Sequence, residues 1–516
     1  MSHQPTSRTS IHRPSATRVW TRRQVLVAGG AGVTIAGLAA CGGSTKRAVA
    51  VPRGAPFVQP RQLTSTNGRL EVTLRAEAGT VGSGSAQRFA YTYNGMSPGP
   101  TLRVRPGDQL VITLENRLDE PTNLHTHGLH VSPSGEGDNV FVRVDPGTSH
   151  TYRYEIPTDH RSSLCWYHPH HHGMVAPQVS GGLFGGIIVE DAIDEIHEIA
   201  GSTERILIVN DPRIGDTRAV LEASGMQLMQ GREGDTALVN GLAEPIIPTT
   251  AGTLERWRIL NASPSRYYRV ALDGHSFHVI ATDGGRLADA TELDEILLAP
   301  GERTEVLVTP TSAGSYALRT RGYDRGSAGM GGGGGGGMGA GTNTPGGGAQ
   351  TLATLTVSGS GTAAALPATL AGSSTLEAGA AGSERTLELG MGMGGAGMGG
   401  GGMGGGGAMR SFTIDGRSFD PTRTDITVTG DSTEDWVITN TSTMDHPFHL
   451  HAWPFRVVER TSGPLDLPGW KDTVNVPAGG RVRIRIPFTD ITGRTVYHCH
   501  ILDHEDQGMM GIIEVR

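Results

Sequence analysis

The chain has few cysteines, and their number excludes one class of fold. Only Cys41, Cys165 and Cys499 occur in 516 residues. A disulfide-stapled secreted scaffold is dense in cysteine. The fold must therefore rest on other means, and we expect hydrophobic cores, with bound metal where cysteine and histidine cluster, to hold it together.

Charged and aromatic residues are also scarce, at 18% and 5% of the chain. Glycine is abundant instead, with 77 residues, about twice the ordinary share of ~7%. This composition favours short strands and turns over long helices. A length of 516 residues exceeds a single core and suggests about three domains of ~150 residues.

The first forty residues contain no Asp or Glu and only one long apolar run, Val25 to Ala40. Five arginines precede or border this run: Arg8, Arg13, Arg18, Arg22 and Arg23. This order is typical of a signal peptide, and the run is short and glycine-rich for a retained membrane helix, which is the less favoured alternative.

Two patterns refine the prediction for residues 1–41. The sequence TRRQVL at 21–26 is similar to a twin-arginine (Tat) export signal, and LAAC at 38–41 is similar to a bacterial lipobox. We expect export to the outer face of the cytoplasmic membrane, the cell surface or the periplasm, with a lipid anchor at Cys41. The alternative is cleavage nearby without lipid. Removing the leader leaves 38 basic against 51 acidic residues, a formal charge of −13, which argues against nucleic acid as a partner.

One turn-and-strand pattern occurs three times. An Asn-Gly or Asp-Gly turn at 94, 240 and 415 leads through a proline and a glycine to a strand that closes on Asn116, Asn261 and Asn440. Alternating runs such as RVRIRI at 481–486 indicate half-buried strands. The sequence predicts an all-β chain of three related β-sandwich domains, at residues 55–195, 200–360 and 383–516.

Two segments, 326–348 and 390–409, consist almost entirely of glycine and methionine. They carry seven of the fifteen methionines. Such segments lose too much backbone entropy to fold alone, so we expect mobile loops. Their thioethers are soft ligands suited to Cu(I), while inert low-complexity filler is the alternative.

Histidines gather in four clusters, each with an His-X-His pair, or an His-Cys-His triplet, at a spacing that lets two imidazoles share one face of a strand. In the last cluster, alternation sends Cys499 to the opposite side from its two histidine neighbours. The paired residues are His125 and His127, His168 and His170, His449 and His451, and His498 and His500. Cys499 with two imidazoles and a weak axial thioether is the blue-copper ligand set, for which His446, His504 and Met509 remain available.

These motifs resemble the three-domain multicopper oxidases, which include laccases and bacterial cuprous oxidases. The resemblance implies three cupredoxin-like Greek-key β-sandwiches and four coppers per chain, and it implies that one-electron oxidations at a type 1 copper drive the reduction of dioxygen to water at a trinuclear cluster. The implied type 1 ligands are His446, Cys499, His504 and Met509. The implied type 2 ligands are His125 and His449, and the implied type 3 ligands are His127, His168, His170, His451, His498 and His500.

The resemblance also implies two acidic residues in a proton relay, Glu505 and Asp138, for which plain surface carboxylates are the alternative. The ending around His504, together with the Gly-Met segments, is similar to the cuprous oxidases. Met444 matches that family's substrate-copper site, but Ser442 replaces its acid, and Asp445 lies beside it.

We therefore expect a monomer that is attached to the membrane only by lipid and that uses dioxygen and Cu(I) as substrates. Small phenolic or aromatic reductants, in a laccase-like oxidase, are the runner-up. A copper-buffering lipoprotein, or a ligand-poor structural member such as the cupredoxin-fold cell-division proteins, is disfavoured by the intact ligand set.

Overall fold

A computed structural model describes residues 51–516, apart from residue 191 and the segments 328–347, 371–378, 394–409 and 462–466. The chain divides into two units, Met1–Lys46 and Arg47–Arg516, and the described residues belong to the second. The predicted signal peptide with Cys41 and most of both Gly-Met segments lie outside the described residues. Among the described residues, no helix is both long and apolar enough to cross a bilayer.

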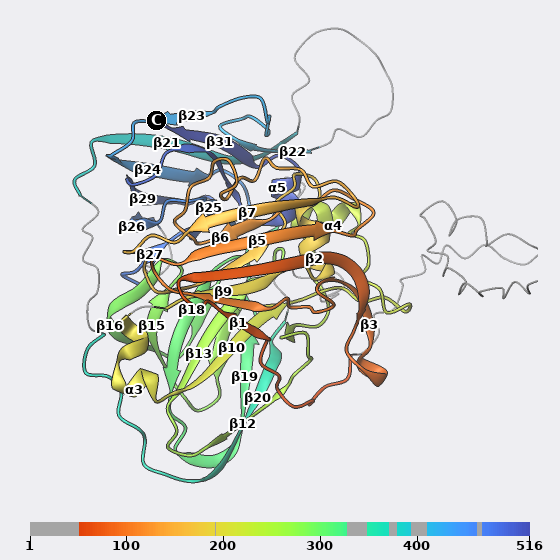
Figure 1. The fold of residues 1–516 in the computed structure, drawn as a ribbon, viewed down its shortest axis with the longest axis vertical. Coiled ribbons are helices and arrows are strands. Elements are labelled where there is room, and N and C mark those ends of the chain that lie inside the picture. Colours follow the sequence, from red (N-terminus) through yellow and green to blue (C-terminus); the bar gives the residue numbers. More distant parts are fainter. Residues whose placement is uncertain (1–50, 191, 328–347, 371–378, 394–409, 462–466) are drawn as a thin grey trace, which may run out of the picture. The chain divides into compact units, whose positions relative to one another are not determined.

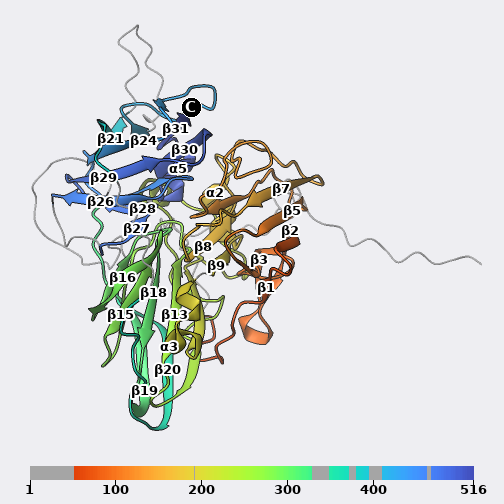
Figure 2. The ribbon, with the colours of Figure 1, turned by 60° about the vertical axis from the view of Figure 1, so that its left-hand side comes forward.

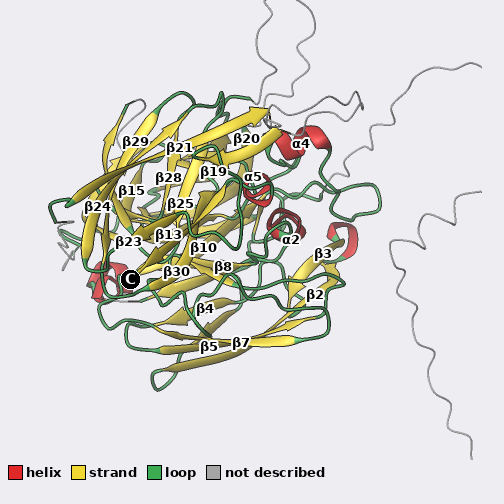
Figure 3. Cartoon of the chain, turned by 90° about the horizontal axis from the view of Figure 1, so that it is seen from above, coloured by secondary structure: helices red, strands yellow, loops and turns green. Residues whose placement is uncertain are grey.

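Strands dominate the described part of the chain, and its helices have seven residues or fewer (Figure 3). The strands form six sheets, which fall into three consecutive pairs along the sequence (Figures 1 and 2). The short helices are η1 (Gly84–Ala86), α2 (Val175–Gly181), η2 (Ala192–Glu195), α3 (His197–Ala200), α4 (Gly225–Gln230) and α5 (Leu502–Asp506). The all-β prediction is confirmed.

The first pair of sheets is built from β1 to β9. One sheet has the order β1 (Gln62–Thr64), β4 (Thr101–Val104), β9 (Gly185–Val189), β8 (Ser163–His168), β6 (His125–His127). The other has the order β3 (Arg88–Tyr93), β2 (Arg69–Val81), β5 (Gln109–Asn116), β7 (Ser149–Glu155). Two histidine motifs thus lie on neighbouring strands, β6 and β8, at one edge of a sheet.

The second pair is built from β10 to β20. Its six-stranded sheet has the order β11 (Leu238–Val239), β10 (Thr203–Asn210), β13 (Glu255–Asn261), β18 (Arg303–Val308), β15 (Phe277–Thr282), β16 (Gly285–Leu293). Its five-stranded sheet has the order β12 (Ile246–Thr250), β20 (Gln350–Ser360), β19 (Ser312–Arg321), β14 (Tyr268–Leu272), β17 (Ile296–Leu298).

The third pair is built from β21 to β31 and repeats this plan. One sheet has the order β22 (Arg410–Ile414), β21 (Ser383–Met393), β24 (Ser432–Asn440), β29 (Arg481–Phe488), β26 (Phe455–Arg460), β27 (Trp470–Lys471). The other has the order β23 (Ile426–Val428), β31 (Met510–Val515), β30 (Gly493–Cys499), β25 (His446–Leu450), β28 (Thr473–Val476). The other two histidine motifs lie on β25 and β30, which are again neighbours.

The three sequence repeats have a common physical basis. Each turn residue at 94, 240 and 415 adopts a positive φ, which Asn and Asp tolerate. The glycine that follows each of them also has a positive φ, a conformation that favours glycine. Each closing asparagine is buried, and its side-chain amide donates to two backbone carbonyls. Those carbonyls belong to Glu120 and Val144 for Asn116, to Arg266 and Leu298 for Asn261, and to Met444 and Val476 for Asn440.

The cores lie between the paired sheets. In β29 the apolar residues Val482, Ile484 and Ile486 are buried against Trp436, as the alternating sequence predicts. Each such side chain contributes roughly 1.5–3 kcal/mol on burial. The third core also includes Cys499 and Met509, so the cysteine cluster is built directly onto a sandwich core.

Candidate metal centre

Strand pairing brings the first two histidine motifs together. In the antiparallel pair β6 and β8, His125 lies opposite His168, and His127 lies opposite Trp166. His170 follows two residues after the end of β8, and all four motif histidines are buried. The first sandwich therefore presents four imidazoles in one buried group.

The same pairing joins the third and fourth motifs. In the antiparallel pair β25 and β30, His449 lies opposite His498, and Phe448 lies opposite Cys499. Neighbouring residues in a strand point to opposite faces. Cys499 therefore faces His446 and His504, while His498 faces the other imidazoles, as alternation predicts.

The cysteine group is compact. The Cys499 sulfur lies 3.3 Å from His446 Nδ1 and 3.9 Å from His504 Nδ1, and all three side chains are buried. The buried Met509 belongs to the same core cluster and its carbonyl accepts from the Cys499 amide at 3.0 Å. Burial lowers the pKa of His446 to about 3, which keeps the imidazole neutral and able to bind metal. Burial raises the pKa of the Cys499 thiol, so a bound metal would have to displace its proton.

The eight remaining histidines converge from the first and third sandwiches. The ring centroids of His170 and His451 are 4.6 Å apart, and those of His170 and His498 are 4.9 Å apart. The Nε2 atom of His498 lies 3.2 Å from that of His170 and 3.1 Å from that of His451. Neutral imidazole nitrogens are metal ligands, so three that converge in this way could hold one metal ion.

The other motif histidines gather beside this triplet. The ring centroid of His127 lies 5.1 Å from that of His500 and 6.0 Å from that of His168, and the centroids of His125 and His449 are 5.8 Å apart. The structure thus brings the histidines that the resemblance assigns to type 2 and type 3 copper into one buried cluster.

Several imidazoles are held by one ring nitrogen and offer the other. His125 Nδ1 lies 2.8 Å from Asp138, His168 Nδ1 lies 2.9 Å from the Pro169 carbonyl, and His449 Nδ1 lies 2.8 Å from the Asp472 carbonyl. The opposite nitrogen of each, Nε2, is buried without a hydrogen-bond partner among the described residues. Metal-binding histidines are oriented in this way. The residues present therefore fit copper.

Two predicted acids also lie at the histidine cluster. Glu505 is fully buried, with Oε2 3.2 Å from His498 Nδ1 and Oε1 3.5 Å from His170 Nε2. Burial, with a smaller effect of Asp506, raises the pKa of Glu505 well above its ordinary range. Burial likewise raises the pKa of Asp138 to about 6, although hydrogen bonds from Thr126 oppose the shift. Both groups are placed to hold a proton near the cluster.

A third acid, Asp472, was not predicted from the sequence. Its Oδ1 lies 2.9 Å from His127 Nε2, and Arg303 of the middle sandwich binds both its oxygens at 2.7 Å. Burial alone would raise the pKa of Asp472, but the guanidinium lowers it. The only signal in the sequence is a charged Lys-Asp pair directly before the short alternating stretch from Thr473 to Val476.

The middle sandwich contributes residues next to the histidine cluster. Gly301 has φ +86°, and a Cβ there would lie 2.8 Å from His500 Nε2. A Cβ on Gly128, beside His127, would lie still closer to the Arg303 guanidinium. Residues of the middle sandwich therefore shape the wall of the histidine cluster.

The predicted Cu(I) residues lie beside the cysteine group. Met444 is fully buried in the third core. The Asp445 carboxylate accepts from Tyr323 Oη (2.6 Å), Asn475 Nδ2 (2.9 Å) and the Ala478 amide (2.9 Å). These three donors engage the carboxylate in structural contacts. Ser442, which replaces the expected acid, places Oγ 2.9 Å from His446 Nε2.

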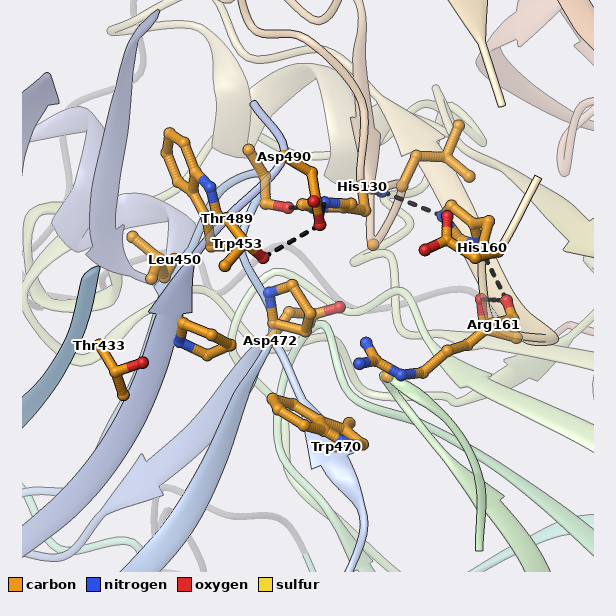
Figure 4. A pocket seen from close by; sticks show the side chains of 18 of the residues that line it. His130, His160, Arg161, Thr433, Leu450, Trp453, Trp470, Asp472, Thr489 and Asp490 are labelled. Carbon is orange, nitrogen blue, oxygen red and sulfur yellow. Dashed lines mark hydrogen bonds and ion pairs between the residues drawn. The ribbon is translucent and has the colours of Figure 1, made fainter. Parts of the chain in front are cut away.

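A cavity of about 250 Å³ reaches Asp472 from outside the cluster (Figure 4). Figure 4 shows Arg161 and Trp470 on one side, with the guanidinium 4.3 Å from the indole centroid, and His130 and Asp490 on another. Gly128 and Leu450 also line the cavity. It is wide enough for water or dioxygen, and these two lining residues adjoin motif histidines, Gly128 next to His127 and Leu450 next to His451.

Three family models described as multicopper oxidase match the chain, at residues 76–194, 214–334 and 402–516. The chain belongs to the multicopper oxidase family. A multicopper oxidase of Staphylococcus haemolyticus is 31% identical over 459 residues, which are 87% of this chain and 89% of that protein. The predicted family and its three cupredoxin-like domains are confirmed.

Two further relatives of this multicopper oxidase are described by different functions, one as a metallo-oxidase and one as a cell division protein. A multicopper oxidase of Campylobacter jejuni, described as a metallo-oxidase, has a solved structure with 29% identity and a TM-score of 0.79, covering 92% of this chain and 98% of that one. The cell division protein FtsP of Proteus mirabilis is 28% identical and covers 96% of this chain and 99% of its own length. Family membership therefore leaves the electron donor to be argued from the site.

Proposed function

We propose that the protein is a cuprous oxidase that uses four coppers per chain to reduce dioxygen to water. His446, Cys499, His504 and Met509 would hold the type 1 copper. His125 and His449 would hold type 2, and His127, His168, His170, His451, His498 and His500 would hold the type 3 pair. Bound copper would supply one-electron acceptance at the first site and four-electron reduction of dioxygen at the histidine cluster.

Cu(I) is favoured as the electron donor because both imidazoles beside Cys499 are covered by other residues. His446 and His504 are fully buried. The Nε2 edge of His446 meets Ser442 Oγ at 2.9 Å, and the Nε2 edge of His504 meets the Met229 carbonyl of α4 at 3.1 Å. A bulky phenol needs an open imidazole edge for contact, whereas a small metal ion can bind outside this cover. The geometry favours Cu(I) over aromatic donors.

Both Gly-Met segments adjoin residues that lie next to the cysteine group. Gly326, where the first Gly-Met segment begins, forms a β-bridge with Met444, and Thr443 Oγ1 donates to the Ser327 carbonyl at 2.6 Å. Met391, in the second segment, pairs with Phe412 across β21 and β22, and the Phe412 ring stacks on His504 at 4.3 Å. Thioethers in these segments are soft ligands for Cu(I).

The chain links the two proposed copper sites directly. Cys499 is bonded to His498 and His500, so the path between the sites runs through a few covalent bonds of β30 and the residue after it. Glu505, against His498 and His170, would deliver protons to one side of the cluster, and Asp138, against His125, would deliver them to the other.

Oxygen consumption tests this proposal, measured for the copper-loaded protein with Cu(I) and with a bulky phenol. A variant with Met393, Met398, Met403 and Met409 changed to serine should lose Cu(I) turnover and keep its turnover of the phenol. Changing Ala396 and Ala408 to serine in the same segment is the matched control. Equal Cu(I) to phenol ratios in all three proteins would favour the laccase-like alternative.

The FtsP relative raises a second possibility, a structural protein without copper chemistry. The converging unpartnered imidazoles argue against it, because buried polar nitrogens without partners are costly unless a ligand satisfies them. Copper content after reconstitution separates the two, since a structural protein would bind substoichiometric copper and consume no oxygen.

We also propose that the protein is exported by the Tat pathway and anchored by lipid at Cys41. The support is the sequence of residues 1–41 alone. Cys41→Ala should move active protein from the membrane fraction to the soluble fraction, and Arg22→Lys with Arg23→Lys should block export. A Cys41→Ala protein that stays in the membrane fraction contradicts the anchor.

A further inference from the structure

One buried arginine of the middle sandwich has no role in the site described above. Arg325 is fully buried, and its backbone carbonyl accepts from the Asp445 amide at 2.7 Å. The next residue, Gly326, forms a β-bridge with Met444. The middle sandwich is therefore pinned to the two residues that precede His446.

The Arg325 guanidinium is held by a carboxylate that it shares with a second arginine. Its Nε and one terminal nitrogen donate to Glu233 Oε1 at 3.1 and 2.9 Å. The other terminal nitrogen is buried without a hydrogen-bond partner among the described residues. Glu233 is shared, because its Oε2 also lies 3.3 Å from Arg266, which pairs with Asp211 at 2.6 Å. One carboxylate thus serves two buried guanidiniums, although Asp211 adds a second negative charge on the Arg266 side.

The contacts of Arg325 tie it to both histidines of the cysteine group. Its backbone carbonyl binds Asp445, which adjoins His446 in the chain. Its carboxylate partner Glu233 adjoins Arg232, whose guanidinium binds Asp503 at 2.7 Å, and Asp503 adjoins His504.

The carboxylate of Asp445, the residue before His446, is bound by other groups and does not pair with the Arg325 guanidinium in the contacts described. Its carboxylate accepts from Tyr323, Asn475 and the Ala478 amide, as described above, while only its backbone meets Arg325. Solvent cannot screen the guanidinium, because it is fully buried.

We propose that Arg325 is a positioning residue for redox chemistry, a fixed positive charge from the middle sandwich that raises the reduction potential of the type 1 copper. This inference rests on the copper ligation given under Proposed function. A fixed positive charge destabilises Cu(II) more than Cu(I), because Cu(II) carries the larger charge. The middle sandwich would thereby set how readily the site accepts an electron.

The test is a redox titration of the blue band in copper-loaded full-length variants. Arg325→Met should weaken one-electron reduction about tenfold, which is about 59 mV for a one-electron couple. Arg325→Lys keeps the charge and should stay close to the parent. Glu233→Gln removes the counter-charge and should shift the potential in the opposite direction, upward.

The opposite signs separate electrostatics from general disruption, since a merely loosened site would move both variants the same way. Unchanged potentials in Arg325→Met and Glu233→Gln, or shifts of the same sign, overturn the inference. If Arg325→Met does not take up copper, the sign of the Glu233→Gln shift decides alone. A parent protein without a blue band refutes the proposed function instead, so the two failures are distinguishable.

Discussion

Asp472→Asn removes the charge of a carboxylate that ties the middle sandwich to the histidine cluster. In the parent, Arg303 binds both Asp472 oxygens at 2.7 Å, and the Arg303 side chain is 1% exposed. Breaking a buried ion pair by neutralising one partner costs about 3–5 kcal/mol, because the other charge is left uncompensated. Asparagine keeps the shape and one acceptor, and Asp283 lies 3.7 Å from Arg303, so we expect the lower value, about 3 kcal/mol.

The assay is thermal unfolding followed by calorimetry. For a domain of roughly 150 residues, each kcal/mol shifts the midpoint by about 2–4 °C, so Asp472→Asn should lower it by about 6–12 °C. The matched control is Asp435→Asn. Asp435 also binds an arginine through both oxygens, with Arg485 at 2.7 and 3.0 Å, but that arginine is 29% exposed.

An ion pair of this exposed kind contributes at most about 1 kcal/mol, so the control should shift the midpoint by less than about 4 °C. Equal midpoints for the two variants would refute the reasoning. It would mean that the Arg303 pair contributes no more than a surface pair and that the clamp between sandwiches lies elsewhere.

Three further substitutions test individual roles. Cys499→Ser should abolish the blue band and oxidase activity while thermal unfolding shows a folded protein, and a retained band contradicts the ligand assignment. Glu505→Gln should lower oxygen turnover by about 10²–10⁴ with the band intact, and full turnover would exclude a proton role. Gly301→Ala should lower the copper content, because the added Cβ would press on His500. Gly416→Ala, which is also at positive φ but faces open space, should not lower it. Equal copper content in the two variants would show that the wall of the cluster is not tightly packed at Gly301.

Much of the fold followed from local signals in the sequence. The Asn-Gly and Asp-Gly turns and their closing asparagines predicted three related sandwiches, because each residue type is required by a specific backbone geometry or buried amide contact. Alternation in strands also predicted that Cys499 and His498 face different sites. Such periodic features need no knowledge of which strands meet.

The contributions of the middle sandwich could not be predicted in this way. Asp472, Arg303 and Gly301 act across contacts between residues up to 345 positions apart, as in the contact between His127 and Asp472. No spacing rule connects them, and each residue type is ordinary in its local sequence. The covering of His504 by the Met229 carbonyl is equally invisible, because every residue has a carbonyl.

The proposed function requires that electrons from four one-electron oxidations meet at one cluster and reduce dioxygen to water. The most direct test is the stoichiometry of the copper-loaded protein, with Cu(I) oxidised and oxygen consumed measured together and released hydrogen peroxide assayed. We expect four Cu(I) per dioxygen and no peroxide above background. A ratio of two with peroxide released, or no oxygen consumption at full copper loading, would contradict it.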